Sequence, residues 1–123
     1  MNDERTMRIG EVADRTSLSL RTLRHYEDMG LVEPSGRTDG GFRLYTEQDV
    51  ERLLIIRRMK PLGYSLEEMR DLLELVDELA VAPDDKELRS RLGDIRGSAT
   101  LRRQRLAEQL AMADEFVQEL GRI

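Results

Sequence analysis

Basic and polar side chains recur at helical spacing early in this sequence. Arg21, Arg24 and His25 would lie on one face of a helix, opposite the face that carries Leu20 and Leu23. An arginine side chain can donate two hydrogen bonds to a guanine or pair with a phosphate, and charge alone does not separate these two roles. The pattern therefore indicates contact with nucleic acid, and a helix face that is simply solvated is the alternative.

The sequence offers no set of residues suited to catalysis or to a transition metal. His25 is the single histidine, and there is no cysteine. A nucleophile with its base and a tight transition-metal site are therefore not predicted, while oxygen-ligated metals stay open. We predict that the protein is not an enzyme and holds no cofactor, and that His25 is a polar DNA contact rather than a catalytic or pH-sensing group.

Two short helices must position this basic face. Ser19 is a suitable N-cap, because its side-chain oxygen can accept an otherwise unpaired amide of the first helical turn. Gly30 is a suitable stop for the same helix. An earlier short helix is predicted around Ile9 and Val12, and a turn at residues 16–17 joins the two. Two short helices separated by a tight turn are typical of a helix-turn-helix.

A hairpin is predicted directly after this helix. Asp39 and Gly40 lie between two short segments and favour a tight turn. The hairpin would hold Arg37, Arg43 and Tyr45 close to the basic helix. A basic helix beside a basic hairpin is the geometry of a winged helix-turn-helix, in which the helix enters the major groove and the wing contacts the backbone.

Two further helices are predicted from their N-terminal caps. Thr46 with Asp49 is a weaker relative of a capping box, and Pro61 ends the helix that it opens. Ser65 with Glu68 is a full Ser-x-x-Glu capping box. The helix behind it carries apolar residues along one side, namely Leu66, Met69, Leu72, Leu73, Val76 and Leu79.

A single long helix is predicted to close the chain. Residues 81–85, which include Pro83, form the predicted linker, and Asp84 or Asp85 caps a final segment over residues 86–123. The apolar residues of this segment follow a heptad pattern. This apolar stripe consists of Leu88, Leu92, Ile95, Ala99, Leu106, Leu110, Ala113, Val117 and Leu120.

The apolar stripe predicts a homodimer. Its gaps are 4, 3, 4, 7, 4, 3, 4 and 3, and the gap of seven contains a four-residue stutter at which a supercoil unwinds locally. Gly93 and Gly97 cost roughly 1 kcal/mol each relative to Ala, and the sequence leaves open whether they kink or break the helix. Because a long helix with a narrow apolar seam is not stable alone in water, a second copy of the chain is its simplest partner.

Composition and charge limit where DNA could bind. Of the 123 residues, 39% are hydrophobic and 37% are charged, so small helical packing and a dimer seam suit the chain better than a large core. The net charge is −5. Residues 1–65 hold 11 Lys and Arg against 11 Asp and Glu, and residues 66–123 hold 9 against 14. DNA affinity must therefore come from a local cluster of basic residues rather than from the net charge.

The sequence also predicts a cytoplasmic protein. No apolar run approaches the roughly 20 residues of a membrane span, and the polar N-terminus does not have the pattern of a signal peptide. Without cysteine, nothing indicates an oxidising compartment. Residues 1–7 are polar and are expected to be frayed.

Five short motifs follow one another within residues 8–80. They are Ile9-Gly10-Glu11-Val12-Ala13, Arg21-Thr22-Leu23-Arg24-His25-Tyr26-Glu27, Gly30-Leu31-Val32, Gly41-Phe42-Arg43-Leu44-Tyr45 and Leu62-Gly63-Tyr64-Ser65-Leu66. In order and spacing they resemble the MerR family of bacterial transcription regulators. Many members of that family have Tyr where this chain has His25, and many carry Cys ligands or a large ligand domain after the coil, which this sequence does not show.

The resemblance implies a mainly α fold. A winged helix-turn-helix domain, here residues 1–80, would be followed by the linker and by an antiparallel coiled-coil dimerisation helix. It also implies a function. The homodimer would straddle a pseudo-palindromic promoter spacer that is too long for RNA polymerase and would distort the DNA, as an activator or as a repressor.

The resemblance also implies roles for particular residues. The predicted DNA-binding set comprises Ser19 at the start of the basic helix, Arg21, Thr22, Arg24 and His25 facing the groove, Tyr26, Arg37, Arg43 and Tyr45 gripping phosphate, and Lys60 with Tyr64 as a second wing. The nine residues of the apolar stripe form the predicted dimerisation set.

A protein-interaction module without DNA is the main alternative. It would explain the coiled coil but not the clustering of basic residues on the helix and the hairpin. The effector is left open by the sequence, since a small apolar ligand near residues 72–79, a protein partner or control by abundance alone would all fit. The target promoter, and activation as opposed to repression, are left open as well.

Overall fold

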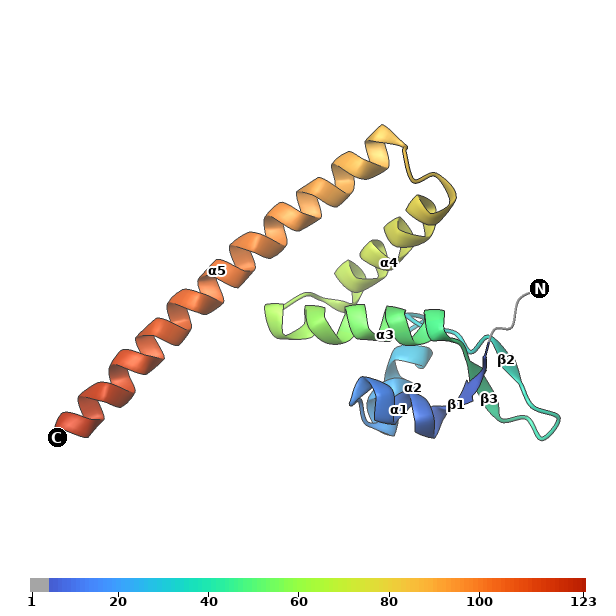
Figure 1. The fold of residues 1–123 in the computed structure, drawn as a ribbon, viewed down its shortest axis with the longest axis horizontal. Helices are drawn as coiled ribbons and strands as arrows, with labels where there is room; N and C mark the ends of the chain where they lie inside the picture. The colour runs from blue at the N-terminus through green and yellow to red at the C-terminus, as the bar shows by residue number, and fades with distance from the viewer. Residues whose placement is uncertain (1–4) are drawn as a thin grey trace. The chain divides into compact units, whose positions relative to one another are not determined.

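The computed structural model describes residues 5–123. Its elements in chain order are β1 (Met7–Arg8), α1 (Ile9–Thr16), α2 (Leu20–Asp28), β2 (Gly36–Arg37), β3 (Arg43–Tyr45), α3 (Glu47–Met59), the 3-10 helix η1 (Lys60–Leu62), α4 (Leu66–Val81) and α5 (Lys86–Arg122). Helices dominate, and a small sheet accompanies the first three of them (Figure 1). The predicted mainly α fold with a helix-turn-helix and a wing is confirmed. The chain divides into two units, Met1–Glu74 and Leu75–Ile123, which are described separately.

Local capping explains where most helices begin. The side chains of Ser19, Thr46, Ser65 and Asp85 each accept the backbone N–H of the residue three positions on. Each such cap stabilises a helix by about 1 kcal/mol. At α3 the cap is stronger than the sequence suggested, because Asp49 also accepts the Thr46 amide and completes a full capping box.

The turn between α1 and α2 is tight. Ser17 adopts a left-handed conformation with φ of 57°, and α2 begins three residues later. At the other end of α2, Gly30 has a φ of 76°, which a residue without Cβ adopts without strain. The predicted start and stop of the basic helix are therefore confirmed.

The sheet has the strand order β1–β3–β2, and both pairs are antiparallel. Met7 pairs with Tyr45, and its side chain is buried. The prediction that residues 1–7 are frayed is therefore wrong at Met7, because β3 supplies a partner strand from nearly forty residues away. Residues 1–4 lie outside the described part of the chain.

The core of the first unit forms around α3. Val50, Leu53, Ile56 and Met59 on this helix are buried, while Leu54 is only partly so. They pack with buried side chains from all around the unit, among them Val12, Leu23, Tyr26, Leu31, Tyr45, Met69 and Leu73. The basic helix α2 and the strand β3 are therefore held on one common core.

The second unit consists of the end of α4 and the whole of α5. An ion pair between Glu78 and Arg91, with 3.4 Å between Oε2 and Nη1, joins the two helices. Helix α5 is continuous through Gly93 and Gly97, so neither glycine breaks it. No residue of α5 is buried. The predicted long helix is thus present. Its apolar stripe is half-buried from Leu88 to Ala99 and exposed from Leu106 to Leu120.

Candidate nucleic-acid interface

Helix α2 presents the predicted basic face. Arg21, Arg24 and His25 are exposed, while Leu23 and Tyr26 on the opposite side are buried in the core. The core therefore fixes the rotation of the helix about its own axis. The three polar side chains are left free to reach base edges or phosphates.

The two hydroxyl groups at the start of α2 are bonded to each other. The Ser19 hydroxyl accepts the Thr22 amide at 3.0 Å and donates to Thr22 Oγ1 at 2.9 Å. Ser19 is therefore chiefly a cap. It lies beside the predicted DNA-binding residues on the first turn of the helix.

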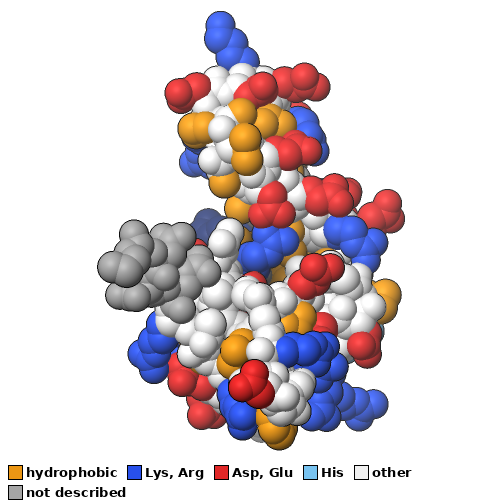
Figure 2. All heavy atoms as spheres, turned by 90° about the vertical axis from the view of Figure 1, so that its right-hand side faces the viewer, with side chains coloured by type: hydrophobic (Ala, Val, Ile, Leu, Met, Phe, Trp, Pro, Cys, Tyr) orange, Lys and Arg blue, Asp and Glu red, His pale blue; other side chains and the backbone are white. Residues whose placement is uncertain are grey.

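Strands β2 and β3 form the wing, a hairpin whose connecting loop runs over residues 38–42. The Thr38 amide donates to the Phe42 carbonyl at 2.9 Å, and the Gly41 amide donates to the Thr38 carbonyl at 2.9 Å. The predicted hairpin is confirmed with Asp39 and Gly40 in its loop, although the residue with positive φ is Gly41. Figure 2 faces the side of the molecule on which the hairpin lies in Figure 1, and Lys and Arg side chains gather in the lower part of that face.

Two arginines stand directly opposite each other in the wing. Arg37 of β2 pairs with Arg43 of β3 in the strand register. Like charges at opposed positions repel, and a nearby anion relieves the repulsion. Arg43 already has such an anion in Glu27. Among residues 5–123, exposed Arg37 donates only to the Gly41 carbonyl, at 3.1 Å. Arg37 is therefore well placed to receive a phosphate.

Glu27 of α2 holds the wing strand to the basic helix. Its carboxylate accepts the Tyr45 hydroxyl at 2.8 Å and lies 2.6 Å from Arg43 Nε. Its side chain is only 13% exposed, so both interactions are largely shielded from water. Burial, and then the hydrogen bond to Glu27, raises the pKa of Tyr45 well above its ordinary value. The network fixes the distance between the two predicted DNA-contacting elements.

The other predicted DNA-binding residues lie in different surroundings. Tyr26 and Tyr45 are buried, so the phosphate contacts predicted for them stay predictions. Lys60 is exposed at the start of η1, and Tyr64 is half-buried against the core after that turn. Their role as a second wing also stays a prediction.

Two features of the interface were missed from the sequence. The guanidinium of Arg8 lies over the ring of Phe42, 4.2 Å from its centroid, and so connects β1 with the wing loop. Arg15 of α1 forms a two-bond ion pair with Glu47 of α3, including a 2.8 Å bond from Nη2 to Oε2. This ion pair raises the pKa of Arg15 and lowers the pKa of Glu47. Neither pair joins residues close in sequence, so local patterns do not signal them.

Residues 5–123 show neither a metal-binding cluster nor a membrane-spanning helix. No group of three or more His, Cys, Asp and Glu side chains is arranged to hold a metal ion there. In the same residues no helix is both long enough and apolar enough to cross a membrane. The capped basic helix α2 and the basic wing attached to it by Glu27 together define a winged helix-turn-helix DNA-binding protein.

Comparison with known proteins identifies the family. The model of the MerR HTH family regulatory protein matches residues 7–75, and the model described as MerR, DNA binding matches residues 50–123. The chain belongs to the MerR family of DNA-binding transcription regulators.

Curated relatives match between about half and nine tenths of this chain. The chain is 46% identical over 70 residues to the mercuric resistance operon regulatory protein of Bacillus cereus, covering 57% of this chain and 53% of the relative. It is 48% identical over 68 residues to the HTH-type transcriptional regulator ZntR of Escherichia coli K12, covering 55% and 48%. The HTH-type transcriptional regulator YfmP of Bacillus subtilis matches over more of its length, at 36% identity over 119 residues, covering 90% and 80%. The chain spans about half the length of the first two of these relatives.

Solved structures extend the likeness to the long helix. The N-terminal part of MtaN, the multidrug transporter activator of Bacillus subtilis, has a TM-score of 0.60 at 29% identity and covers 94% of this chain and 95% of that one. HiNmlR, a MerR-family regulator lacking the sensor domain and solved bound to promoter DNA, has a TM-score of 0.71 at 24% identity and covers 95% and 89%. At that identity the second likeness shows the fold alone.

Proposed function

We propose that this chain acts as a homodimer on a pseudo-palindromic promoter spacer and regulates transcription by distorting the DNA. The observation that carries the proposal is the exposed face of Arg21, Arg24 and His25 on α2, beside a wing that Glu27 holds in place. Two such helices, one from each protomer, enter successive major grooves. Bending or untwisting the DNA between them is the regulatory output, as activation or repression.

The roles within one protomer follow from exposure and charge. Arg21, Thr22, Arg24 and His25 face base edges in the groove, and Arg37 receives a phosphate at the wing. Arg43 and Tyr45 support the wing through Glu27, and Lys60 with Tyr64 lies at a second backbone contact. Residues 1–80 form the DNA-binding domain and residues 81–85 the linker.

Residues 86–123 form the dimerisation helix in this proposal. A helix of 37 residues with no buried side chain leaves its apolar stripe exposed from Leu106 onward, and a second copy is the simplest cover for it. Leu106, Leu110, Val117 and Leu120 are all exposed. The dimer meets RNA polymerase through the shared promoter, in the cytoplasm.

Charge reversal on the two exposed elements tests the proposal. Arg24→Glu together with Arg37→Glu is expected to weaken binding to duplex DNA at least ~100-fold, since both changes place a carboxylate against phosphate. Arg43 is left unchanged because its loss would disturb Glu27. Arg122→Glu changes the charge of an exposed residue at the end of α5 and is expected to keep DNA binding within about threefold. If the double variant stays dimeric and binds DNA as tightly as the wild type, the proposed interface is wrong.

A further inference from the structure

The apolar stripe of α5 has the same spacing in both directions along the helix. From Leu88 to Val117 the gaps between successive members are 4, 3, 4, 7, 4, 3 and 4. The centre of this pattern lies between Arg102 and Arg103. In an antiparallel pair, each position faces one that is equally far beyond the centre. This symmetry lets each of the eight stripe residues from Leu88 to Val117 meet another of the eight, and only Leu120 has no counterpart. A parallel pair needs no such symmetry.

One register matches the stripe most completely, because it pairs eight of the nine stripe residues. Ala99 faces the partner's Leu106, Leu92 faces the partner's Ala113, and Ile95 faces the partner's Leu110. Each alanine of the stripe then meets a leucine, which keeps the spacing between the helices even. This register leaves a second row of apolar side chains uncovered.

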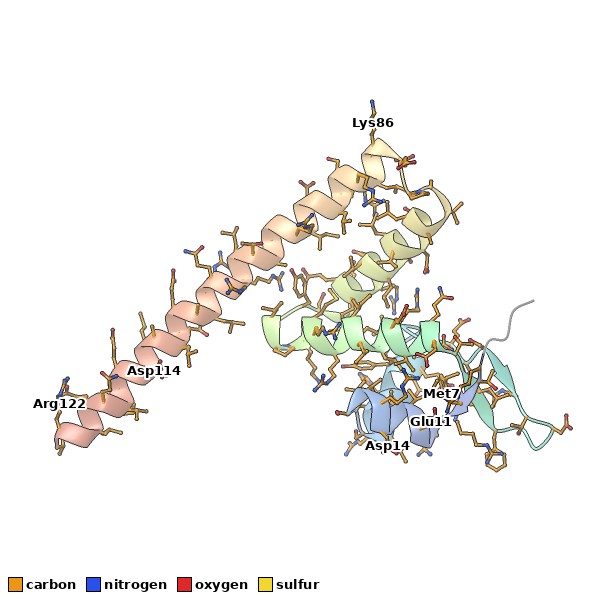
Figure 3. All side chains as sticks on the ribbon, viewed as in Figure 1. Met7, Glu11, Asp14, Lys86, Asp114 and Arg122 are labelled. Carbon is orange, nitrogen blue, oxygen red and sulfur yellow. The ribbon has the colours of Figure 1, made fainter. Side chains whose placement is uncertain are left out.

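The second row lies on the C-terminal part of α5. Met112, Phe116 and Ile123 are exposed, Phe116 by 63%. At about 100° per residue, Phe116 points roughly 80° away from the middle of the stripe, outside the narrow seam that two helices cover. Figure 3 shows side chains around Asp114 and Arg122 extending from this part of α5 on several sides.

A groove lies at the N-terminal end of α5, between that end and the C-terminal end of α4, within the second unit. It has a volume of about 590 Å³, and its apolar lining comes from Val81, Ala82 and Leu88. Glu78 and Arg91, which form the ion pair between the two helices, lie at its edge. Val81, the last residue of α4, is 88% exposed, so it is open to a partner.

Phe116 and the groove lie on the same flank of α5. Phe116 is 29 residues from Glu87 and 25 from Arg91, both of which line the groove. At about 3.6 residues per turn these separations are close to eight and seven whole turns, so the three side chains point in nearly the same direction. In a two-fold antiparallel pair each flank faces the same flank of the partner.

We propose that α5 pairs in this register with a second copy of the chain and that Phe116 is thereby seated in the α4–α5 groove of the partner. About this centre of symmetry, Phe116 lies at the same height along the helix axis as the partner's Arg89. That height is midway between the partner's Glu87 and the partner's Arg91, the two groove residues on the same flank. The inference rests on the proposed homodimer and adds its register and a second contact outside the seam. Each dimer contains two such contacts.

Disulfide formation tests the register, because the native sequence has no cysteine. Chains carrying Ala99→Cys and chains carrying Leu106→Cys are mixed, and a mixed disulfide dimer is expected on oxidation. Leu106→Cys alone is not expected to cross-link to itself, since the two copies would stand roughly 10 Å apart along the axis, beyond the span of a disulfide. Self-cross-linking of Leu106→Cys, or no mixed disulfide from dimeric protein, overturns the register.

Substitution of Phe116 tests the groove contact. Phe116→Ala is expected to raise the dimer dissociation constant about 100-fold by analytical ultracentrifugation, because the lost contact counts twice in a symmetrical dimer. The matched control is Leu101→Ala, another exposed apolar residue of α5, at 57% exposure, which lies near the centre of the helix and away from the groove. Its dissociation constant should change by no more than about twofold.

The outcomes separate this inference from the proposed function. A wild-type chain that is monomeric at micromolar concentration contradicts the homodimer itself. If the wild type is dimeric and neither Phe116→Ala nor Leu101→Ala changes the dimer dissociation constant, the seating of Phe116 in the groove is wrong. The second apolar row would then contact another partner. DNA binding by Leu101→Ala shows that the helix is otherwise intact.

Discussion

Replacing Tyr45 by Phe removes one hydrogen bond from the network between α2 and the wing. The lost bond, from the Tyr45 hydroxyl to a Glu27 oxygen at 2.8 Å, joins a buried donor to a largely shielded carboxylate. Hydrogen bonds to charged groups contribute about 1.5–3 kcal/mol, so the free energy of unfolding should fall by about 2 kcal/mol. With a urea dependence of about 2 kcal/mol per molar, the midpoint of urea unfolding should fall by about 1 M.

A double-mutant cycle assigns this loss to the network. In a Glu27→Ala background, Tyr45→Phe should cost much less, and the coupling free energy should be at least about 1 kcal/mol. An unchanged urea midpoint together with a tenfold or greater loss of DNA affinity would refute the reasoning. Tyr45 would then act as a phosphate ligand and not as a support for the wing.

The same network should respond to high pH. Burial and the bond to Glu27 raise the pKa of Tyr45 above its ordinary 10.0, so the folded protein holds the hydroxyl proton more tightly than the unfolded chain does. The stabilisation is therefore complete below pH 10 and is lost as the pH rises above it. The stability difference between the wild type and Tyr45→Phe, measured by urea unfolding, should narrow above pH 10.

Three further predictions concern pairs and turns elsewhere in the chain. Glu47→Gln should lower the urea midpoint at pH 7, and because its pair with Arg15 lowers the pKa of Glu47 from 4.5, the difference from wild type should shrink as the pH falls below 4.5. Gly93→Ala should raise the free energy of unfolding by about 0.5–1 kcal/mol, because Gly93 lies inside a helix. Gly63→Ala should lower it by about 1–2 kcal/mol, because Gly63 has a φ of 84°. The melting temperature should therefore rise for the first variant and fall for the second. Arg8→Ala should weaken DNA binding about three- to tenfold in a fluorescence titration, since the cation–π contact with the wing loop contributes roughly 0.5–1 kcal/mol and the lost charge adds to it; equal affinity would contradict a role in the wing.

Local chemistry explains why much of the fold could be predicted. Ser19, Ser65 and Asp85 cap helices through residues three positions away, so the signal for each lies within a few residues. The start and stop of α2 follow in the same way from Ser19 and Gly30. The site was predictable to the extent that its basic residues share that one helix and the adjacent hairpin.

The parts that were missed depend on contacts between distant residues. Strand β1 is two residues long and exists because β3 pairs with it. A segment this short shows no alternation of apolar and polar residues, so the sequence does not signal a strand at Met7. Glu27 appears in the sequence as one more charged residue on a polar helix, and its role follows only when β3 brings Tyr45 to it. The sequence also left open whether α5 continues through Gly93. It does continue, because the roughly 1 kcal/mol that a glycine costs in a helix is small compared with the stabilisation from the many good helix formers around it.

The central claim is that two copies of the exposed face of α2 recognise DNA sequence. Its most direct test is selection of the purified full chain against randomised duplex DNA at near-physiological salt. The account predicts enrichment of a two-fold-related motif whose half-sites lie about one helical turn of DNA, or a multiple of it, apart. Recovery of nothing above background, from protein shown to be folded and dimeric, would contradict it.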